Sequence, residues 1–541
     1  MRRVCHSSVR WTCQRGYQTQ ANVSAAPKRS LFPWLAGTVA AAGGGYWLGT
    51  SNLQQPVATP TTEQIQQLGQ SSLKEPTVPS HTTIQQAFRK LQAVLPPEHV
   101  TVDQDILNQH GYSNNSYHNE GAPNIVVFPR STEEVAAIVK IANELSLPII
   151  PFSGGTSLEG HFSAPRGGIC ISFTEHMDHI VAFHPEDMDI VVQPGIGWED
   201  LNAELKKHGL FFPLDPGPGA CIGGMVGTGC SGTNAVRWGT MREWVLNLTV
   251  VLPNGQIIKT RQRPRKSSAG YDLTRLMIGS EGTLGIVTEA TLKLAVIPPE
   301  ETVAVCDFPS VRDAAAVVPD LIRAGVQIGA VELLDELMMK AVNLANPSLG
   351  HKERPTLFLK FSGSKPQIEH EIELVSKIVK DHQGGTFRYA KNDHEKADLW
   401  EGRKICLWSS TLLKENASIW TTDVVVPVSK LPELIDETKK DLATSSLPAP
   451  MVGHVGDGNF HVFILFDKSK PEEYAEAKRL NKNLLTRAIR MEGSVTGEHG
   501  VGYGKKEYLP AELGEGTVEL MRTVKRAIDP KNIMNPGKVL P

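Results

Sequence analysis

Residues 217–240, GPGACIGGMVGTGCSGTNAVRWGT, contain eight glycines and restrict the possible folds more than any other part of the chain. Glycine has no Cβ, so a glycine-rich backbone can approach a ligand closely. The stretch carries a single charge, on Arg237, which is unlike the composition of a solvated, disordered linker. We therefore expect an ordered loop that lies against a bound molecule.

Part of this loop, GTGCSG (227–232), matches the GxGxxG pattern of nicotinamide-dinucleotide-binding Rossmann folds. Those folds need a strand before the glycines, a helix after them and an acidic residue about twenty residues further on. Here another glycine-rich loop precedes the match, and the predicted hairpin LTVVLPNGQIIKT follows it. The sequence therefore argues against a nicotinamide cofactor.

Two further glycine-rich loops accompany predicted strands. NIVVFP and LPIIPF predict strands on either side of a helix that runs from an N-cap at Ser131, with Glu134 completing a capping box, to about Ser146. SGGTSLEG (153–160) follows, and its successive backbone N–H groups could form a phosphate-binding nest, although an ordinary surface turn is the alternative. GSEGTLGIVTEATLKL (279–294) predicts a glycine turn before a strand.

In combination, the three glycine-rich segments resemble the FAD-binding (PCMH-type) domain of the vanillyl-alcohol-oxidase flavoproteins. The resemblance implies that all three contact FAD. The implied contacts are Ser153, Gly154, Gly155, Thr156, Ser157, Gly224, Thr228, Ser231, Asn234, Glu281 and Ile286. Covalent members often have a histidine at the position of Thr156, so we expect non-covalent FAD; His161 is not an obvious substitute.

GHVGDGNFH (453–461) contains two histidines around a predicted turn. The dipeptide Asp457-Gly458 is a strong signal for a two-residue hairpin loop, which would place His454 directly opposite His461. Opposed residues have Cβ atoms about 4.5–5.5 Å apart, close enough for two imidazoles to bind one ion. The spacing alone leaves a cross-strand polar pair equally open.

From about residue 298 the pattern changes to strands such as TVAVCDF, TLFLKF and TTDVVVPV, which alternate with amphipathic segments such as residues 368–381. That pattern predicts an α+β domain. Within it, GSVTGEHGVG (493–502) supplies Glu498, which with the two histidines would complete a metal site with open coordination positions. His499 follows directly, and only a loop conformation would bring both side chains to one substrate.

These residues, together with WEGRK (400–404) and NIMNPGKV (532–539), resemble the mitochondrial, cytochrome-linked D-lactate dehydrogenases and their relatives that act on other D-2-hydroxy acids. The resemblance runs from about residue 100 to the C-terminus. It implies that His454, His461 and Glu498 bind a divalent metal, zinc or manganese, that His499 is the catalytic base, and that Arg403 binds the substrate carboxylate. A solvated histidine and a surface ion-pair arginine are the alternatives for the last two.

The chemistry implied is oxidation of D-lactate to pyruvate, with hydride transfer to FAD and cytochrome c as the electron acceptor; oxygen and quinone are the alternative acceptors. A metal that binds the substrate hydroxyl lowers its pKa, and a histidine with an ordinary pKa near 6.5 can then take the proton. D-2-hydroxyglutarate or glycolate is an alternative substrate. A non-catalytic, membrane-tethered flavin- or metal-binding protein is an alternative of another class.

The N-terminus has the composition of a mitochondrial presequence: no acidic residue precedes Glu63, and six arginines and lysines lie within residues 1–30. The uncharged segment 31–49 is 19 residues long with aromatics near both ends, which suits a membrane helix. All six positive charges precede it, so we expect the rest of the chain in the intermembrane space, on the inner mitochondrial membrane. A cleaved or flexible segment is the alternative.

The expected fold is α+β. Its expected parts are a presequence (1–30), a transmembrane segment (31–49), a linker (50–82), a PCMH-type FAD-binding domain (83–297) and a ferredoxin-like cap domain that binds substrate (298–541). The net charge of −3 makes a nucleic-acid binder by bulk charge unlikely, and the 7 cysteines include no CxxC pair. We therefore expect neither a nucleic-acid partner nor a thiolate zinc site.

Overall fold

The structure, a computed structural model, describes residues 77–113 and 116–541. The predicted presequence and membrane segment, and most of the predicted linker, lie outside the described residues. Within the described ranges, no helix is long and apolar enough to cross a membrane.

The first sheet contains the predicted strand–helix–strand unit. Its strand order is β1-β2-β4-β3, and β2 and β3 both run parallel to the central β4. The strands are β1 (Val100–Thr101), β2 (Ile125–Val127), β3 (Ile149–Phe152) and β4 (Ile169–Ser172). Helix α5 (Thr132–Leu145) starts at the predicted N-cap, Ser131, and ends at Ser146. The capping box is only half formed, because the Glu134 carboxylate accepts the backbone N–H of Arg130 instead.

A second, antiparallel sheet has the order β5-β6-β10-β8-β9. Its strands are β5 (Ile180–His184), β6 (Asp189–Val192), β8 (Val245–Val251), β9 (Ile257–Lys259) and β10 (Ile286–Lys293). The predicted hairpin forms β8 and β9, and the strand predicted after the third glycine turn forms β10. The helices of this part are α3 (His81–Gln92), α4 (Gln104–Gln109), α6 (Trp198–Leu205), α7 (Ile222–Thr228), α8 (Ala235–Trp238), α9 (Met241–Trp244) and α10 (Leu273–Met277).

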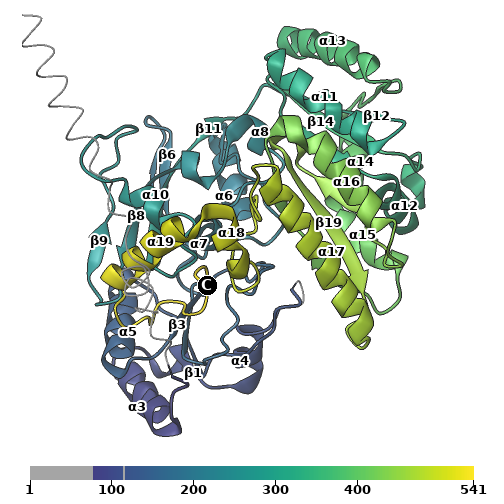
Figure 1. Ribbon diagram of the computed structural model, residues 1–541. Helices are drawn as coiled ribbons and strands as arrows, with labels where there is room; N and C mark the ends of the chain where they lie inside the picture. Colours follow the sequence, from purple (N-terminus) through teal and green to yellow (C-terminus); the bar gives the residue numbers. More distant parts are fainter. Residues whose placement is uncertain (1–76, 114–115) are drawn as a thin grey trace, which may run out of the picture. The chain divides into compact units, whose positions relative to one another are not determined.

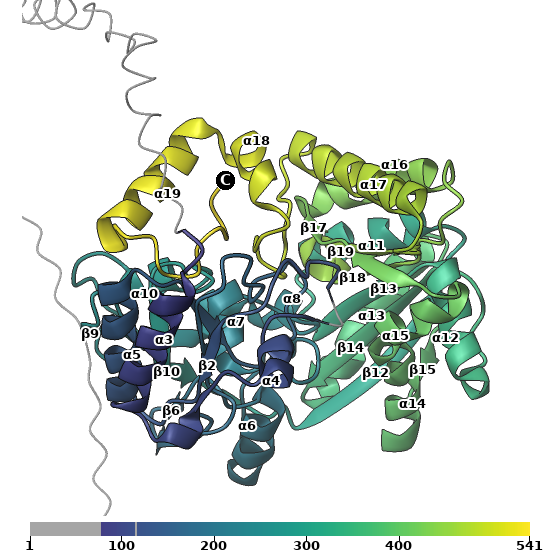
Figure 2. The same ribbon diagram turned by 90° about the horizontal axis from the view of Figure 1, so that it is seen from below.

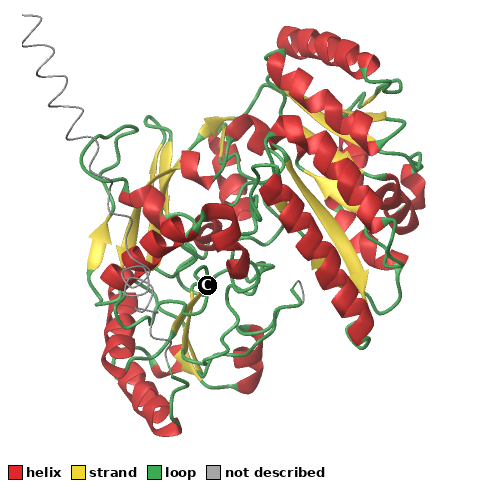
Figure 3. Cartoon of the chain, viewed as in Figure 1, coloured by secondary structure: helices red, strands yellow, loops and turns green. Residues whose placement is uncertain are grey.

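The cap is a three-layer structure around an eight-stranded antiparallel sheet. The strands are β12 (Glu300–Asp307), β13 (Ala330–Leu334), β14 (Thr356–Gly363), β15 (Arg388–Tyr389), β16 (Ser418–Thr421), β17 (Val424–Val425), β18 (Met451–Gly453) and β19 (Asn459–Phe466). One face packs against α11 (Val311–Arg323), α13 (Lys365–Asp381), α16 (Leu431–Leu442) and α17 (Pro471–Arg490). The other packs against α12 (Glu336–Ala345), α14 (Asp393–Lys404) and α15 (Cys406–Ser410) (Figures 1 and 3).

The chain order β12-α11-β13-β14-α13-β15, in which α12 is an insertion between β13 and β14, is the ferredoxin-like arrangement, and the strand order β15-β12-β14-β13 agrees with it. The sheet continues through the pairing of β13 with β18 into a second, shorter set of elements. This set contains the strands β16, β18 and β19 and the helices α16 and α17. The predicted strands TVAVCDF and TLFLKF form β12 and β14. TTDVVVPV is divided: Thr421 ends β16, and only Val424 and Val425 form the short β17, because the chain leaves the sheet at Thr422 and Asp423.

The last segment of the chain returns to the first sheet. After α18 (Leu509–Leu513) and α19 (Glu515–Ile528), the Ile149 N–H of β3 donates to the carbonyl of Ile533, and the Asn535 N–H donates back to Ile149. The buried Nζ of Lys525 donates to the carbonyl of Thr283 at 2.7 Å. Figure 2 shows this yellow segment beside α5, where Lys531 Nζ donates to the carbonyl of Asn143 at 2.7 Å. The predicted second domain, 298–541, therefore ends on elements of the predicted first one.

Candidate functional site

A cavity of about 680 Å³ is lined by all three glycine-rich segments and by side chains of the cap. A Cβ built on Gly224 would meet no atom within 4 Å, so the glycine leaves room at the cavity wall. Ser157 Oγ and His161 Nδ1 are buried and have no hydrogen-bond partner among the described residues. Buried polar atoms are normally paired, so these atoms suit a ligand with its own polar groups. The FAD implied by the resemblance fits this cavity.

Most of the predicted FAD contacts lie on the cavity wall. They are Ser153, Gly154, Gly155, Thr156, Ser157, Gly224, Thr228, Glu281 and Ile286. Ser231 and Asn234 do not line it, although Cys230, Gly232 and Thr233 do, because the side chains of Ser231 and Asn234 bind other partners. Ser231 Oγ donates to Glu498 Oε2 at 2.8 Å, and the Asn234 side chain donates to the carbonyl of Pro213.

The Glu281 carboxylate has a further role on the wall. Its two oxygens accept the backbone N–H groups of Val501 and Gly502, both at 2.7 Å. It thereby holds the third glycine-rich segment against the loop that carries Glu498 and His499.

The predicted geometry of the histidine hairpin was wrong. β18 and β19 are antiparallel, but a 3-10 turn, η6 (Val455–Asp457), lies between them, and the register pairs His461 with Val452. His454 is therefore not opposite His461. A type I′ two-residue turn needs positive φ at both central residues, whereas only Gly458 of this loop has it (+86°).

The longer loop still brings the three predicted metal ligands together. Glu498 Oε1 lies 3.0 Å from Nε2 of His454 and 3.4 Å from Nε2 of His461. One ligand atom from each of the three residues lies within 4.8 Å of the other two. Two imidazole nitrogens and a carboxylate at this spacing can bind one divalent ion and leave positions open for substrate.

Both histidines are held so that Nε2 faces Glu498. His454 Nδ1 lies 2.8 Å from Glu332 Oε1, and His461 Nδ1 lies 3.0 Å from the carbonyl of Thr422. Metal-binding histidines usually donate their second N–H to a carboxylate or carbonyl in this way. Burial by itself would lower the pKa of His454, but Glu332 and Glu498 raise that pKa well above its usual value. The two carboxylates thus require a cation between them, either a proton or a metal ion.

The loop that carries Glu498 and His499 folds around the buried carboxylate of Asp423. Asp423 Oδ2 accepts the backbone N–H groups of residues 497, 498 and 499 at 2.8, 3.1 and 3.0 Å, and the Thr496 hydroxyl at 2.8 Å. Burial would raise the pKa of Asp423, but His499, in its protonated form, and Lys505 hold it well below its usual range. This is the loop conformation needed to bring Glu498 and His499 to one site.

His499 is suited to accept a proton. Its ring stacks on that of His461, with 4.8 Å between centroids and 10° between planes. Burial lowers the pKa of His499 to about 4 even though Asp423 opposes that shift, so the ring is neutral at pH 7. Nδ1 is turned toward Asp423 Oδ2, at 3.9 Å, which leaves Nε2 for the cavity that His499 lines.

Arg403 lies on α14 and lines the same cavity. Its Nε donates to Glu332 Oε2 at 2.6 Å, and no described residue accepts a hydrogen bond from its two Nη groups. Those groups are free for a carboxylate. Glu332 is fully buried and links Arg403 to His454. Burial would raise the pKa of Glu332, but His454 and Arg403 lower it, so the carboxylate stays charged.

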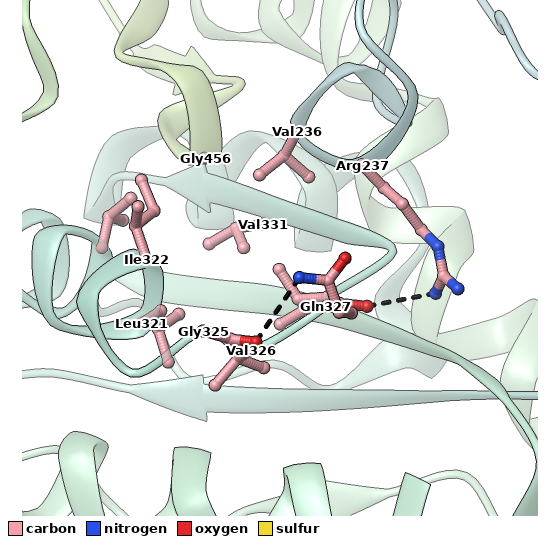
Figure 4. Close-up of a pocket in the computed structure, with 11 residues that line it drawn as sticks. Val236, Arg237, Leu321, Ile322, Gly325, Val326, Gln327, Val331 and Gly456 are labelled. Atoms are coloured by element: carbon pink, nitrogen blue, oxygen red, sulfur yellow. Dashed lines mark hydrogen bonds between the residues drawn. The ribbon is translucent and has the colours of Figure 1, made fainter. Parts of the chain in front are cut away.

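The glycine-rich segment 217–240 also contacts the cap beside this site. Val236 and Arg237 of α8 line a small cavity of about 180 Å³ with residues of α11, β13 and η6 (Figure 4). Arg237 Nη1 donates to the carbonyl of Gln327 at 3.1 Å. Val236 packs on Gly456, where an added Cβ would lie 2.7 Å from Val236 Cγ2. The position of η6, and so of His454, is thereby tied to α8.

Asp423 and Glu332 were not predicted from the sequence. Each is an isolated acidic residue inside an apolar strand pattern, TTDVVVPV and AVELL. Buried charges are rare unless they are paired, so an acidic residue in such a run was the available signal.

Comparison with known proteins gives matches over most of the described chain. The family model "FAD binding domain" matches residues 123–261, and "FAD linked oxidases, C-terminal domain" matches residues 297–539. The chain is 49% identical over 445 residues to the mitochondrial D-lactate dehydrogenase (cytochrome) of Arabidopsis thaliana, covering 82% of this chain and 78% of that protein. It is 51% identical over 429 residues to the mitochondrial D-lactate dehydrogenase (cytochrome) 1 of Saccharomyces cerevisiae, covering 78% and 73%.

Solved structures of lower identity share the fold. A 4-ethylphenol oxidase from Gulosibacter chungangensis has a TM-score of 0.71 at 18% identity, covering 86% of this chain and 98% of that chain. A p-cresol methylhydroxylase has a TM-score of 0.69 at 18% identity, covering 85% and 97%. These likenesses confirm the predicted PCMH-type fold of the cofactor-binding part.

Proposed function

The chain belongs to the FAD-linked oxidases, in the group that includes the mitochondrial, cytochrome-type D-lactate dehydrogenases, and from this premise we propose that it oxidises D-lactate to pyruvate. The observation that carries the proposal is one cavity that joins the glycine-rich walls of an FAD site to Arg403, His499 and the His454–His461–Glu498 cluster. A 2-hydroxy acid offers a carboxylate for Arg403, a hydroxyl proton for His499 and oxygen ligands for a metal ion in the cluster.

FAD would be held by the three glycine-rich segments. Ser153 to Ser157 and Gly224 supply backbone groups that can approach its phosphates, and Glu281 holds the third segment in place. FAD is non-covalent in this proposal, since Thr156 stands where covalent relatives often carry histidine. A divalent metal, zinc or manganese, would be bound by His454, His461 and Glu498, whose nitrogen and oxygen donors suit both ions.

FAD bound there would supply an acceptor for the Cα hydrogen as hydride, and a metal held by the three ligands would lower the pKa of the substrate hydroxyl. The free Nη groups of Arg403 pair with the substrate carboxylate and orient it. His499, neutral at pH 7, takes the hydroxyl proton on Nε2. Asp423 anchors both Glu498 and His499, because its carboxylate accepts the backbone N–H of each.

Electrons pass from FAD to cytochrome c in this proposal, and the enzyme is mitochondrial. The names of the two relatives support both statements. The charge asymmetry around segment 31–49 further supports attachment to the inner membrane, with the catalytic part in the intermembrane space.

Anaerobic titration of the purified flavoprotein tests the proposal. D-lactate should bleach the flavin absorbance, L-lactate should not, and oxidised cytochrome c should restore it. Acid precipitation should release FAD into the supernatant. A flavin that D-2-hydroxyglutarate or glycolate bleaches much faster than D-lactate would overturn the choice of substrate, and yellow colour retained by the precipitate would overturn non-covalent binding.

A further inference from the structure

The chain carries a strongly basic loop that the proposed reaction does not use. Residues 259–266, KTRQRPRK, include five lysines and arginines, and no acidic residue occurs between Glu243 and Asp272. The loop follows β9 and leads into α10, and residues 264–273 are all exposed. A chain whose net charge is −3 thus concentrates positive charge at one place.

Most of these cations have no carboxylate partner. Arg263 is the exception, because its Nη1 lies 2.7 Å from both Asp187 and Asp189. Arg265 donates to the backbone carbonyl of Asp187, and Arg261 donates to backbone carbonyls within its own loop. Among the described residues, neither Lys259 nor Lys266 has an ion-pair partner.

The positive charge of the loop affects a side chain of the neighbouring strand, β10. The pKa of Lys293, on β10, is lowered first by burial and then by the positive charges of Arg265, Arg275 and Arg261, against an opposing effect of Glu243. Lys293 also lies over the ring of Trp244, 5.5 Å from its centroid. The loop, Arg275 of α10 and Lys293 of β10 therefore form a surface with more positive than negative charge, in which Asp187, Asp189 and Asp272 are the neighbouring carboxylates.

Apolar side chains project from the middle of this surface. Tyr271 is 93% exposed, the largest exposed fraction among the large hydrophobic side chains of the described residues. Leu273 and Leu276 of α10 are exposed by 36% and 38%. An aromatic ring and aliphatic side chains surrounded by lysine and arginine are typical of segments that enter the headgroup region of a membrane.

We propose that residues 259–276, the basic loop with α10, dock this protein on an anionic phospholipid surface. The basic side chains bind lipid headgroups, and Tyr271 enters the interface. β9 and α10 lie on the side of the FAD-binding part away from the cap sheet (Figures 1 and 2). Docking there leaves the cap free. It also adds a second attachment that does not depend on the predicted membrane segment.

A fluorescent label on the loop of the full-length protein tests this docking. Ala269→Cys is labelled with a polarity-sensitive dye after Cys5 and Cys13 are replaced by serine; the five cysteines of the described residues are buried. Vesicles of phosphatidylcholine mixed with phosphatidylglycerol should raise the emission, and vesicles of phosphatidylcholine alone should not. High salt should reverse the rise, because surface charges are screened.

Charge reversal supplies the matched comparison. Each basic residue contributes about fivefold to partitioning onto an anionic surface, so Arg265→Glu with Lys266→Glu should weaken the response more than tenfold. Lys377→Glu with Lys380→Glu, an equal change on α13 of the cap, should leave it intact. A label at Ser348→Cys, also on the cap, should not respond.

Three results would overturn the proposal. These are no response to anionic vesicles, an equal response to both lipids, and an equal response after charge reversal in the loop. A response to soluble heparin without one to vesicles would indicate a polyanion in place of a lipid surface. None of these readouts depends on turnover, so failure here is distinguishable from failure of the proposed reaction.

Discussion

At the scale of single residues, the site depends on which ring nitrogen each histidine presents. Glu332 and the Thr422 carbonyl hold Nδ1 of His454 and His461, so both Nε2 atoms face Glu498. His499 differs, because its Nδ1 faces Asp423 without a hydrogen bond. This difference supports the proposed division of the three neighbouring imidazoles into two metal ligands and one base.

Substitution by alanine should separate these roles. His454→Ala and His461→Ala should each lose bound metal and most turnover while FAD stays bound, because the glycine-rich walls do not include them. His499→Ala should keep both metal and FAD and lose roughly 10²–10⁴-fold in turnover, the usual contribution of a general base. Metal analysis, flavin absorbance and D-lactate kinetics measure the three properties. Wild-type protein that is fully active without metal would refute the site.

Glu332 is a positioning residue in this account, since it acts through Arg403 and His454. Glu332→Gln keeps the shape and removes the charge. We expect metal affinity to fall about 10–100-fold, as for other groups that orient metal ligands, and the KM for D-lactate to rise because Arg403 loses its partner. Metal titration and steady-state kinetics measure both. A variant with lower thermal stability but unchanged metal affinity and KM would assign Glu332 a structural role alone.

At the scale of elements, the contact between α8 and η6 sets the position of His454. Gly456→Ala places a methyl group against Val236, and such overpacking costs about 1–3 kcal/mol. We expect lower thermal stability and weaker metal binding. Gly456 has no positive φ, so the effect should come from the side-chain clash, and Val236→Ala in the same chain should restore both properties. A double variant no better than the single one would contradict this account.

His351, between α12 and α14, should make stability depend on pH. Burial and then Arg388 lower its pKa from 6.5 to about 4 in the folded protein. Between these pH values the unfolded chain binds more protons than the folded protein. The contribution of His351 to stability is therefore complete above pH 6.5 and is lost as the pH falls toward 4. His351→Gln can still accept a hydrogen bond from Arg388. It should reduce the number of protons taken up on unfolding by up to one, and so reduce the slope of the unfolding free energy with pH. Denaturant titrations at pH 5 and pH 7.5 measure it; an equal slope in both proteins would contradict the assignment.

The strands and helices that were predicted correctly have signals within a few residues. The N-cap at Ser131 and the apolar period of α5 are such local signals, and so is the alternation in β12 and β14. The register of β18 and β19 could not be predicted, because the 3-10 turn adds residues that a DG dipeptide does not reveal. For Glu498 and His499, the sequence indicated only that a loop conformation would bring both side chains to one substrate. Its actual path depends on Asp423, 75 residues earlier, and on tertiary packing.

At the scale of the whole molecule, the predicted tether and the catalytic part should be separable. Every proposed cofactor, metal and substrate residue lies at or beyond Ser153, so deleting residues 1–50 should yield a soluble, flavin-containing, active enzyme. Fractionation and D-lactate turnover with a soluble acceptor measure this. A truncated protein that folds and binds FAD but has no activity would show that the tether model is wrong.

The return of the C-terminal segment to β3 has a consequence for biosynthesis. A ribosome makes the first sheet early, yet Ile533 and Met534, which pack against it, and Asn535, which donates to the carbonyl of Glu281, are made only after the whole cap. The cofactor-binding part therefore cannot complete its packing until the cap has been translated, or threaded N-terminus first through a translocation channel. A chain truncated before Ile533 would contain both sheets of its first domain and still lack this support.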